Sequence, residues 1–248
     1  MTRAAFLLFG GIAYAVFFAT FLYLIGFVGD LPGLPRTIDR GPAAAAPSAA
    51  AVNLGLIALF GLQHSIMARQ GFKRAWTRIV PEPIERSVYV LFSSAALILL
   101  FLFWQPMPAS VWRVDQPVAA ALIWALFALG WLIVLTSTFL LSHVELFGLK
   151  QVWNNLRGHV AEAPRFGQPF FYRLVRHPLY SGFLLAFWAT PAMSAGHLLF
   201  AVGMSAYMLI AIRLEERDLV DLFGDRYRSY RQEVGMLLPR LRRRSSQP

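Results

Sequence analysis

Apolar residues are concentrated in six blocks along the chain, separated by shorter polar segments. The blocks cover residues 4–28, 51–68, 88–105, 118–142, 179–193 and 197–213. A helix needs about 20 apolar residues to cross the ~30 Å hydrocarbon layer of a bilayer, and the first four blocks reach or approach that length. None has the strict alternation of a half-buried strand. The pattern therefore predicts an all-α integral membrane protein with about six transmembrane helices.

The last two blocks are short and meet around Pro191 and Gly196. Proline and glycine at this point are typical either of a hairpin turn or of a kink within one long helix. The first alternative gives six membrane crossings, and the second gives five. Hydropathy alone does not separate them.

The distribution of basic residues favours the hairpin. Five basic residues follow the second block, five follow the fourth, and nine lie from Arg213 onward, whereas the intervening segments contain only three: Arg36, Arg40 and Arg113. Basic segments of membrane proteins lie on the cytoplasmic side. The tail joins the other basic segments only if residues 179–213 cross the membrane twice. We therefore expect six crossings with both termini in the cytoplasm.

Composition agrees with a single membrane domain over residues 1–248. Apolar residues make up 57% of the chain and charged residues 15%, with a mean hydropathy of +0.54. The net charge of +10 comes from residues that flank apolar blocks, so we expect membrane lipid and no nucleic acid as a partner. There is no cysteine, which excludes disulfides, thiolate metal ligands and a cysteine nucleophile. The first block is longer than the apolar core of a signal peptide, so we expect it to be retained as a membrane span. The Ala/Pro-rich residues 42–51 predict a flexible external loop.

Polar residues within or beside apolar spans are costly and therefore candidates for function. His64 lies near the end of the second block, and His143 and Glu145 follow the fourth. A histidine titrates near neutral pH and suits the role of a base, although a hydrogen bond to a neighbouring helix explains one equally well. His143 and Glu145, two residues apart, point to different faces of a helix. With no recognisable ligand spacing elsewhere, no metal is expected.

A denser set of polar and aromatic residues brackets the last two blocks. Arg176 to Gly182 reads Arg-His-Pro-Leu-Tyr-Ser-Gly and opens the fifth block, and Glu215 and Glu216 follow the sixth. A hairpin brings both clusters to the same membrane face. Arg and His suit a carboxylate, Glu suits ribose hydroxyls or an ammonium, and aromatic rings suit a purine or a sulfonium cation. Alone, the two acids read equally well as a solvated helix end.

The segment after these acids carries a periodic stripe of apolar and aromatic residues. Tyr227, Tyr230 and Val234 fall on one helical face. Such a stripe is typical of an interfacial helix that lies on the bilayer.

These motifs resemble a known family. RHPLYSG, LEERDL and FGDRYRSYRQEV, in this order, resemble the membrane-bound S-adenosylmethionine-dependent methyltransferases of the isoprenylcysteine carboxyl methyltransferase type. GFVGDLPGLPRTID, LQHSIMARQGFKRAWTRIVPEPIERSVYVL and LSHVELFGLKQVWNNLRG resemble the nurim-like branch, and within it the bacterial proteins that methylate methanethiol to dimethyl sulfide. The resemblance implies a bacterial inner-membrane enzyme that uses S-adenosyl-L-methionine and a small thiol. Residues 1–142 would form a four-helix membrane part, and residues 143–248 the cofactor-binding hairpin and tail.

The resemblance also implies which residues form the site. A cofactor pocket would be lined or braced by Arg176, His177, Pro178, Tyr180, Gly182, Glu215, Glu216, Tyr227 and Tyr230. A thiol reacts as its thiolate, so the site must take up the thiol proton. His64 is the first choice as base, with His143 and Glu145 as rivals, and Arg69 or Arg217 could stabilise the thiolate. The alternatives are a membrane methyltransferase with a larger lipid-type substrate and a non-catalytic nurim-like protein.

Overall fold

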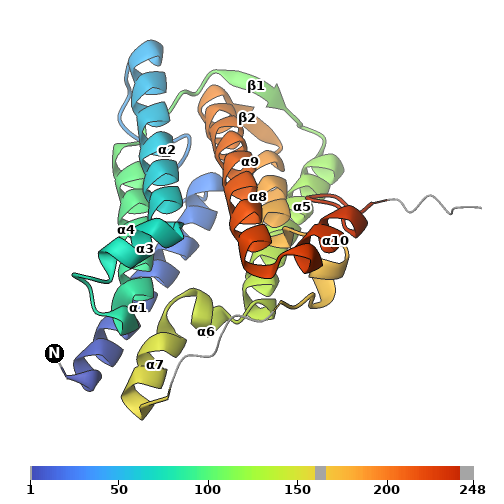
Figure 1. Ribbon diagram of the computed structural model, residues 1–248. Coiled ribbons are helices and arrows are strands. Elements are labelled where there is room, and N and C mark those ends of the chain that lie inside the picture. The colour runs from blue at the N-terminus through green and yellow to red at the C-terminus, as the bar shows by residue number, and fades with distance from the viewer. Residues whose placement is uncertain (1, 160–165, 241–248) are drawn as a thin grey trace, which may run out of the picture.

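The computed structural model describes residues 2–159 and 166–240, which form a helical bundle with one small two-stranded sheet (Figure 1). Within these ranges five helices are long and apolar enough to cross a membrane, and one shorter helix is also apolar. The five are α1 (Arg3–Val28), α2 (Ala46–Ala68), α4 (Glu82–Phe103), α5 (Pro117–Leu140) and α9 (Ala195–Phe223). The chain is a multi-pass membrane protein, and the predicted all-α fold class is confirmed.

The short apolar helix, α8 (Pro178–Trp188), has 11 residues and spans about 16 Å, roughly half of the hydrocarbon layer. The extended residues after it continue in the same direction. There β2 (Ala192–Ser194) pairs with β1 (Ser110–Arg113), the strand that connects α4 to α5. This pairing places the turn between α8 and α9 at the opposite end of the bundle from the start of α8. The predicted hairpin is therefore present, with a short helix and an extended segment as its first arm.

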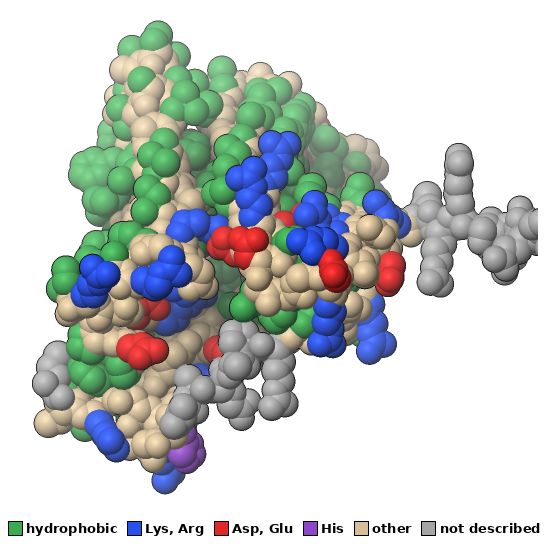
Figure 2. Space-filling model, in the orientation of Figure 1, with side chains coloured by type: hydrophobic (Ala, Val, Ile, Leu, Met, Phe, Trp, Pro, Cys, Tyr) green, Lys and Arg blue, Asp and Glu red, His purple; other side chains and the backbone are tan. Residues whose placement is uncertain are grey.

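The other end of the bundle carries the short surface helices and most of the charge, and we call it the basic end. Its elements are α3 (Gln70–Trp76), α6 (His143–Leu146), α7 (Leu149–Arg157), the 3-10 helix η1 (Phe170–Arg173) and α10 (Asp225–Glu233). Figure 2 shows charged side chains gathered over the lower part of the molecule and apolar side chains above them. Arg165 and Arg242 to Arg244, counted in the charge argument, lie outside the described residues. α9 continues past residue 213 into the basic end.

Proline marks the first turn of four of these helices, α2, α4, α5 and α8. The ring fixes the backbone in a helical conformation where no intrahelical N–H bond is required. α4 begins at Glu82, six residues before the apolar block predicted from residue 88, and Glu82 and Glu85 lie in its first turn. The predicted loop over residues 42–51 is wrong in its second half, because α2 already begins at Ala46. Pro47 and the following alanines favour that earlier start.

The helices pack in two groups around a central space. α1 and α2 lie against α4, α5 pairs along its length with α8, and α9 contacts both α2 and α8. Gly130 and Gly182 permit the close approach of α5 and α8, since a Cβ on Gly182 would lie 2.7 Å from the Gly130 carbonyl oxygen. Small residues at a membrane helix interface commonly have this role. Between the two groups, towards the basic end, the bundle contains a cavity.

Candidate functional site

A buried carboxylate ties together the elements at the basic end. Glu216, on α9, receives Arg176 Nε at 2.7 Å and His177 Nε2 at 3.2 Å on Oε1, and Arg231 Nε at 3.1 Å on Oε2. Its side chain is only 8% exposed. A buried charge is tolerated when it is paired and hydrogen-bonded, and here three cationic or polar groups meet it. Glu216 thus joins the start of α8 to α9 and α10.

The chain after α10 is fastened onto the start of α8. The N–H groups of Arg176 and His177 donate to the carbonyls of Gly235 (2.8 Å) and Met236 (3.1 Å), and Ser181 Oγ donates to Leu237 O at 2.8 Å. Arg176 also donates through Nη1 to backbone carbonyls at the end of α10. The Arg176 guanidinium is therefore occupied by protein acceptors. This arrangement is a structural clamp.

Glu215 is placed differently from its neighbour. Its Oε2 accepts a hydrogen bond from the Tyr180 hydroxyl at 3.2 Å and lies 4.0 Å from His177 Nδ1. The Glu215 side chain is 43% exposed, so it remains open to a ligand. Consecutive residues on a helix point about 100° apart, which is why one glutamate is a buried brace and the other faces outward.

The aromatic stripe on α10 faces the protein interior. Tyr227, Tyr230 and Val234 are buried in a cluster with Phe166 and the end of α9, and the Tyr230 hydroxyl donates to the Tyr172 carbonyl. Burial raises the pKa of Tyr230 to about 12 and that of Tyr227 further. The predicted interfacial helix, with this stripe on the bilayer, is therefore wrong. The periodicity arises because α10 packs against α9 and the segment before α8.

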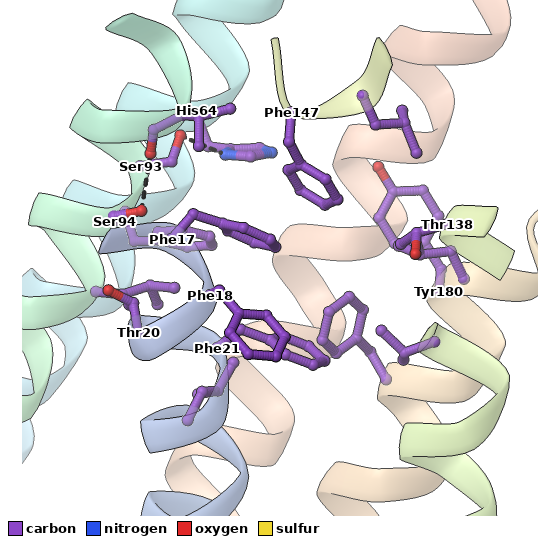
Figure 3. Close-up of a pocket in the computed structure, with 18 of the residues that line it drawn as sticks. Phe17, Phe18, Thr20, Phe21, His64, Ser93, Ser94, Thr138, Phe147 and Tyr180 are labelled. Atoms are coloured by element: carbon purple, nitrogen blue, oxygen red, sulfur yellow. Dashed lines mark hydrogen bonds between the residues drawn. The ribbon is translucent and has the colours of Figure 1, made fainter. Parts of the chain in front are cut away.

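An apolar cavity of about 260 Å³ lies between α1, α2 and α4 on one side and α5, α8 and α9 on the other (Figure 3). Phenylalanine rings make up much of its wall, among them Phe17, Phe21 and Phe147, which Figure 3 shows pointing into the space. Several polar side chains interrupt this wall: Thr20, His64, Arg86, Tyr89, Ser93, Ser94, Thr138, His143, Tyr180 and Tyr207. Tyr180 belongs both to this cavity and to the Glu215 contact. The cavity therefore adjoins the clusters at the basic end.

Two histidines in the cavity wall have both ring nitrogens hydrogen-bonded. His64 lies 2.7 Å from the Tyr89 hydroxyl through Nε2 and 3.0 Å from Ser93 Oγ through Nδ1. His143 lies 2.8 Å from Tyr14 through Nε2 and 2.8 Å from Thr138 through Nδ1. Burial lowers the pKa of His143, which lies in α6 outside the membrane spans. A neutral imidazole of this kind can accept a proton.

Comparison with known proteins shows the family to which the chain belongs. The model of the family described as NnrU protein matches residues 53–236. The chain belongs to the NnrU protein family. A methanethiol S-methyltransferase of Mycobacterium tuberculosis is 54% identical over 96% of this chain and 98% of its own length. Methanethiol S-methyltransferase 1 of Bradyrhizobium diazoefficiens is 55% identical over 94% and 81%, respectively.

A more distant relative belongs to the nurim-like branch predicted from the sequence. Nurim of Xenopus laevis is 31% identical over 67% of this chain and 61% of its own length. No solved structure matches the chain. The resemblance to nurim-like membrane proteins and to the bacterial proteins that act on methanethiol is confirmed.

In this NnrU-family chain the remaining predicted site residues are dispersed. Arg69 forms an ion pair of 2.8 Å with Asp218, and Glu145 forms one of 2.7 Å with Lys150. Arg217 is exposed, and neither Glu145 nor Arg217 lines the cavity. Pro178 occupies the first turn of α8, and Gly182 faces α5. Of the five predicted catalytic side chains, the structure brings only His64 and His143 to the cavity wall.

Sequence reasoning missed the polar face of α4. Arg86, Tyr89 and Ser93 follow the i, i+3, i+7 spacing of one helical face, and all three line the cavity. This stripe in an otherwise apolar span was the available signal. Tyr207 of α9, which also lines the cavity, was missed as well. Its hydroxyl is not part of a periodic polar stripe like the one on α4.

Proposed function

We propose that this chain is an S-adenosyl-L-methionine-dependent S-methyltransferase that converts methanethiol to dimethyl sulfide at the inner membrane of a bacterium. The observation that carries the proposal is the small apolar cavity with a histidine in its wall, adjoining the Glu215 cluster. Relatives about half identical over nearly the whole chain, which are named methanethiol S-methyltransferase, support it.

The size of the cavity suits a small acceptor. Its volume of about 260 Å³ lies below the roughly 300–1,000 Å³ of sites for drug-sized ligands. Its apolar wall favours an uncharged alkyl thiol over a charged one. A small thiol therefore matches the cavity better than a long lipid chain does.

The groups around Glu215 fit the methyl donor by their chemistry. Glu215 is an open carboxylate suited to ribose hydroxyls or an ammonium group, and the rings of Tyr180 and Tyr207 suit a sulfonium cation. Bound there, S-adenosyl-L-methionine supplies an electrophilic methyl group. Arg176, His177 and Glu216 contribute by bracing this wall, because their charged groups are engaged with one another. Tyr227 and Tyr230 support it from behind through α10.

The protein residues have two tasks in the reaction. His64 holds a neutral imidazole beside the cavity and takes up the proton that the reaction releases, and the phenylalanine wall excludes water and aligns sulfur with the methyl group. In this division residues 1–142 supply most of the acceptor cavity and residues 143–248 the donor site. His143, on the opposite wall, is the rival base.

The test is methyl transfer by the purified protein in detergent. Methanethiol and S-adenosyl-L-methionine with a labelled methyl group should give labelled dimethyl sulfide, detected in the headspace by gas chromatography. Glu215→Gln should weaken donor binding in calorimetry, whereas His64→Ala should lower kcat at unchanged donor affinity. Failure to form dimethyl sulfide, although donor binds, would contradict the proposed acceptor.

One observation favours a second candidate, a methyltransferase with a larger substrate. Phe18 and Leu135 line the cavity and are also 42% and 37% exposed on the outside of the bundle. The cavity therefore reaches the surface that the bilayer would cover. Activity with a prenylated thiol but not with methanethiol would establish this candidate instead.

We also propose that the basic end is cytoplasmic, in support of which the basic residues gather there (Figure 2). The absence of cysteine makes the test direct. Gly71→Cys, at the basic end, should resist a membrane-impermeant maleimide in intact cells, whereas Ala44→Cys, before α2, should react. The reverse labelling would invert the orientation.

A further inference from the structure

Tyr89, His64 and Ser93 form a hydrogen-bonded chain whose direction the helix backbone sets. Ser93 Oγ donates to the Tyr89 carbonyl, one turn earlier on α4, at 3.0 Å. With its hydrogen committed there, the Ser93 oxygen accepts from His64 Nδ1–H at 3.0 Å. The lone pair of the imidazole is then on Nε2, where the Tyr89 hydroxyl donates at 2.7 Å. A proton can move along this chain from phenol to imidazole.

The same arrangement occurs a second time on the opposite wall. Thr138 Oγ1 donates to the Leu135 carbonyl at 2.7 Å and meets His143 Nδ1 at 2.8 Å, which leaves Nε2 to accept from Tyr14. The two sets differ in where the phenol lies. Tyr89 lines the cavity, and Tyr14 lies outside the lining residues. Only the first set presents a phenol to a substrate in the cavity.

The positive charge next to Tyr89 suits the transfer of a proton through it. The Arg86 guanidinium lies 4.8 Å from the centre of the Tyr89 ring, so it stabilises electron density on the phenol as the proton leaves. The carboxylate of Glu215 also interacts electrostatically with Tyr89. Tyr89 thus lies in the part of the cavity that faces the donor site.

We propose that Tyr89 is the catalytic residue that takes the thiol proton and passes its own phenol proton to Nε2 of His64. The inference rests on the proposed function and names a further residue for that reaction. The S–H bond breaks as a new O–H bond forms on Tyr89, and the phenol O–H bond breaks as an N–H bond forms on His64. The sulfur electron pair forms the new C–S bond, while the pair of the old bond between methyl and sulfonium sulfur stays on that sulfur, which becomes a neutral thioether. The imidazolium then loses its proton to water.

Moving the proton together with the methyl group has an energetic reason. A free thiolate in an apolar cavity would carry the cost of an unpaired buried charge. In the relay the thiol sulfur gives up its proton to the Tyr89 oxygen while the new C–S bond forms. The negative charge that would develop on the sulfur is therefore neutralised as it appears. Ser93 acts as a positioning residue, because it holds the His64 imidazole in the tautomer that can accept a proton on Nε2.

The test compares thiols of different acidity. Tyr89→Phe keeps the ring and removes the hydroxyl, and Tyr14→Phe is the matched control, because it removes the equivalent bond to His143 outside the cavity. The acceptors are methanethiol and 2,2,2-trifluoroethanethiol, a small thiol that its fluorines make far more acidic. A variant without the relay should still methylate a thiol that ionises unaided.

We expect Tyr89→Phe to lower kcat/KM for methanethiol by about 10²- to 10⁴-fold, with a much smaller loss for trifluoroethanethiol and unchanged donor affinity. Tyr14→Phe should show no difference between the thiols. Ser93→Ala, a milder change, should show the same dependence on acidity with a smaller loss. Equal losses for both thiols, or none, overturn the relay while the function stands. A wild-type protein that binds donor but methylates neither thiol overturns the proposed function and the relay with it.

Discussion

The close approach of α5 and α8 makes a prediction that separates packing from ligand contact at Gly182. An added Cβ there would lie 2.7 Å from the Gly130 carbonyl oxygen and 2.9 Å from the Val134 backbone nitrogen. Ordinary van der Waals contact begins at 3.4 Å, so the two helices would have to separate by about 0.7 Å. Backbone atoms are the obstacle, and no side-chain rotation relieves the clash.

Overpacking of this kind costs about 1–3 kcal/mol. We therefore expect Gly182→Ala to lower the Tm of the protein in detergent, by about 2–4 °C for each kcal/mol. The matched control is Gly55→Ala in α2, where an added Cβ meets no atom within 4 Å. Alanine is the better helix former by about 1 kcal/mol, so this variant should keep or raise the Tm.

The assay is thermal unfolding by circular dichroism without any methyl donor, followed by calorimetric titration with S-adenosyl-L-methionine. Gly130→Ala, with backbone at 2.6 Å, should reproduce the effect from the partner helix. The reasoning is refuted if Gly182→Ala has the wild-type Tm without donor and loses only donor affinity. In that case Gly182 would act at the ligand and not at the helix interface.

Three further outcomes follow from the basic end. Glu216→Gln removes the charge that Arg176 and Arg231 face, and should destabilise the protein by about 3 kcal/mol in denaturant titration; wild-type stability would contradict the brace. Gly235→Ala places a Cβ 1.9 Å from a backbone oxygen and should weaken donor binding about tenfold in calorimetry, whereas Gly167→Ala, with open space, should not. The Tyr230 pKa is raised from about 10 to about 12, so its contribution to stability is complete below pH 10 and is lost as pH rises to 12. Unfolding midpoints across that window should fall less steeply in Tyr230→Phe, and equal slopes would exclude this group.

The common location of Arg176 and Glu216 was predictable, because it depends only on where the two residues lie along the chain. Arg176 and Glu216 are 40 residues apart, yet the charge argument placed them on one face through the hairpin, and the structure joins them directly. Their function as a brace was not predictable, because it depends on which side chain turns inward. Arg69 shows the same limit, since its partner Asp218 lies 149 residues away on another helix.

The sequence by itself determined the membrane class, the number of apolar helices and the common face of the two C-terminal clusters. Hydropathy and charge are summed along the chain, and a bilayer converts these sums directly into spans and sides. Only the tertiary structure decided that α8 is short, that Tyr89 meets His64, and that Glu215 stays open while Glu216 is buried. These outcomes depend on contacts within a few ångströms between helices. Many pairings share the same apolar pattern, and packing selects one of them.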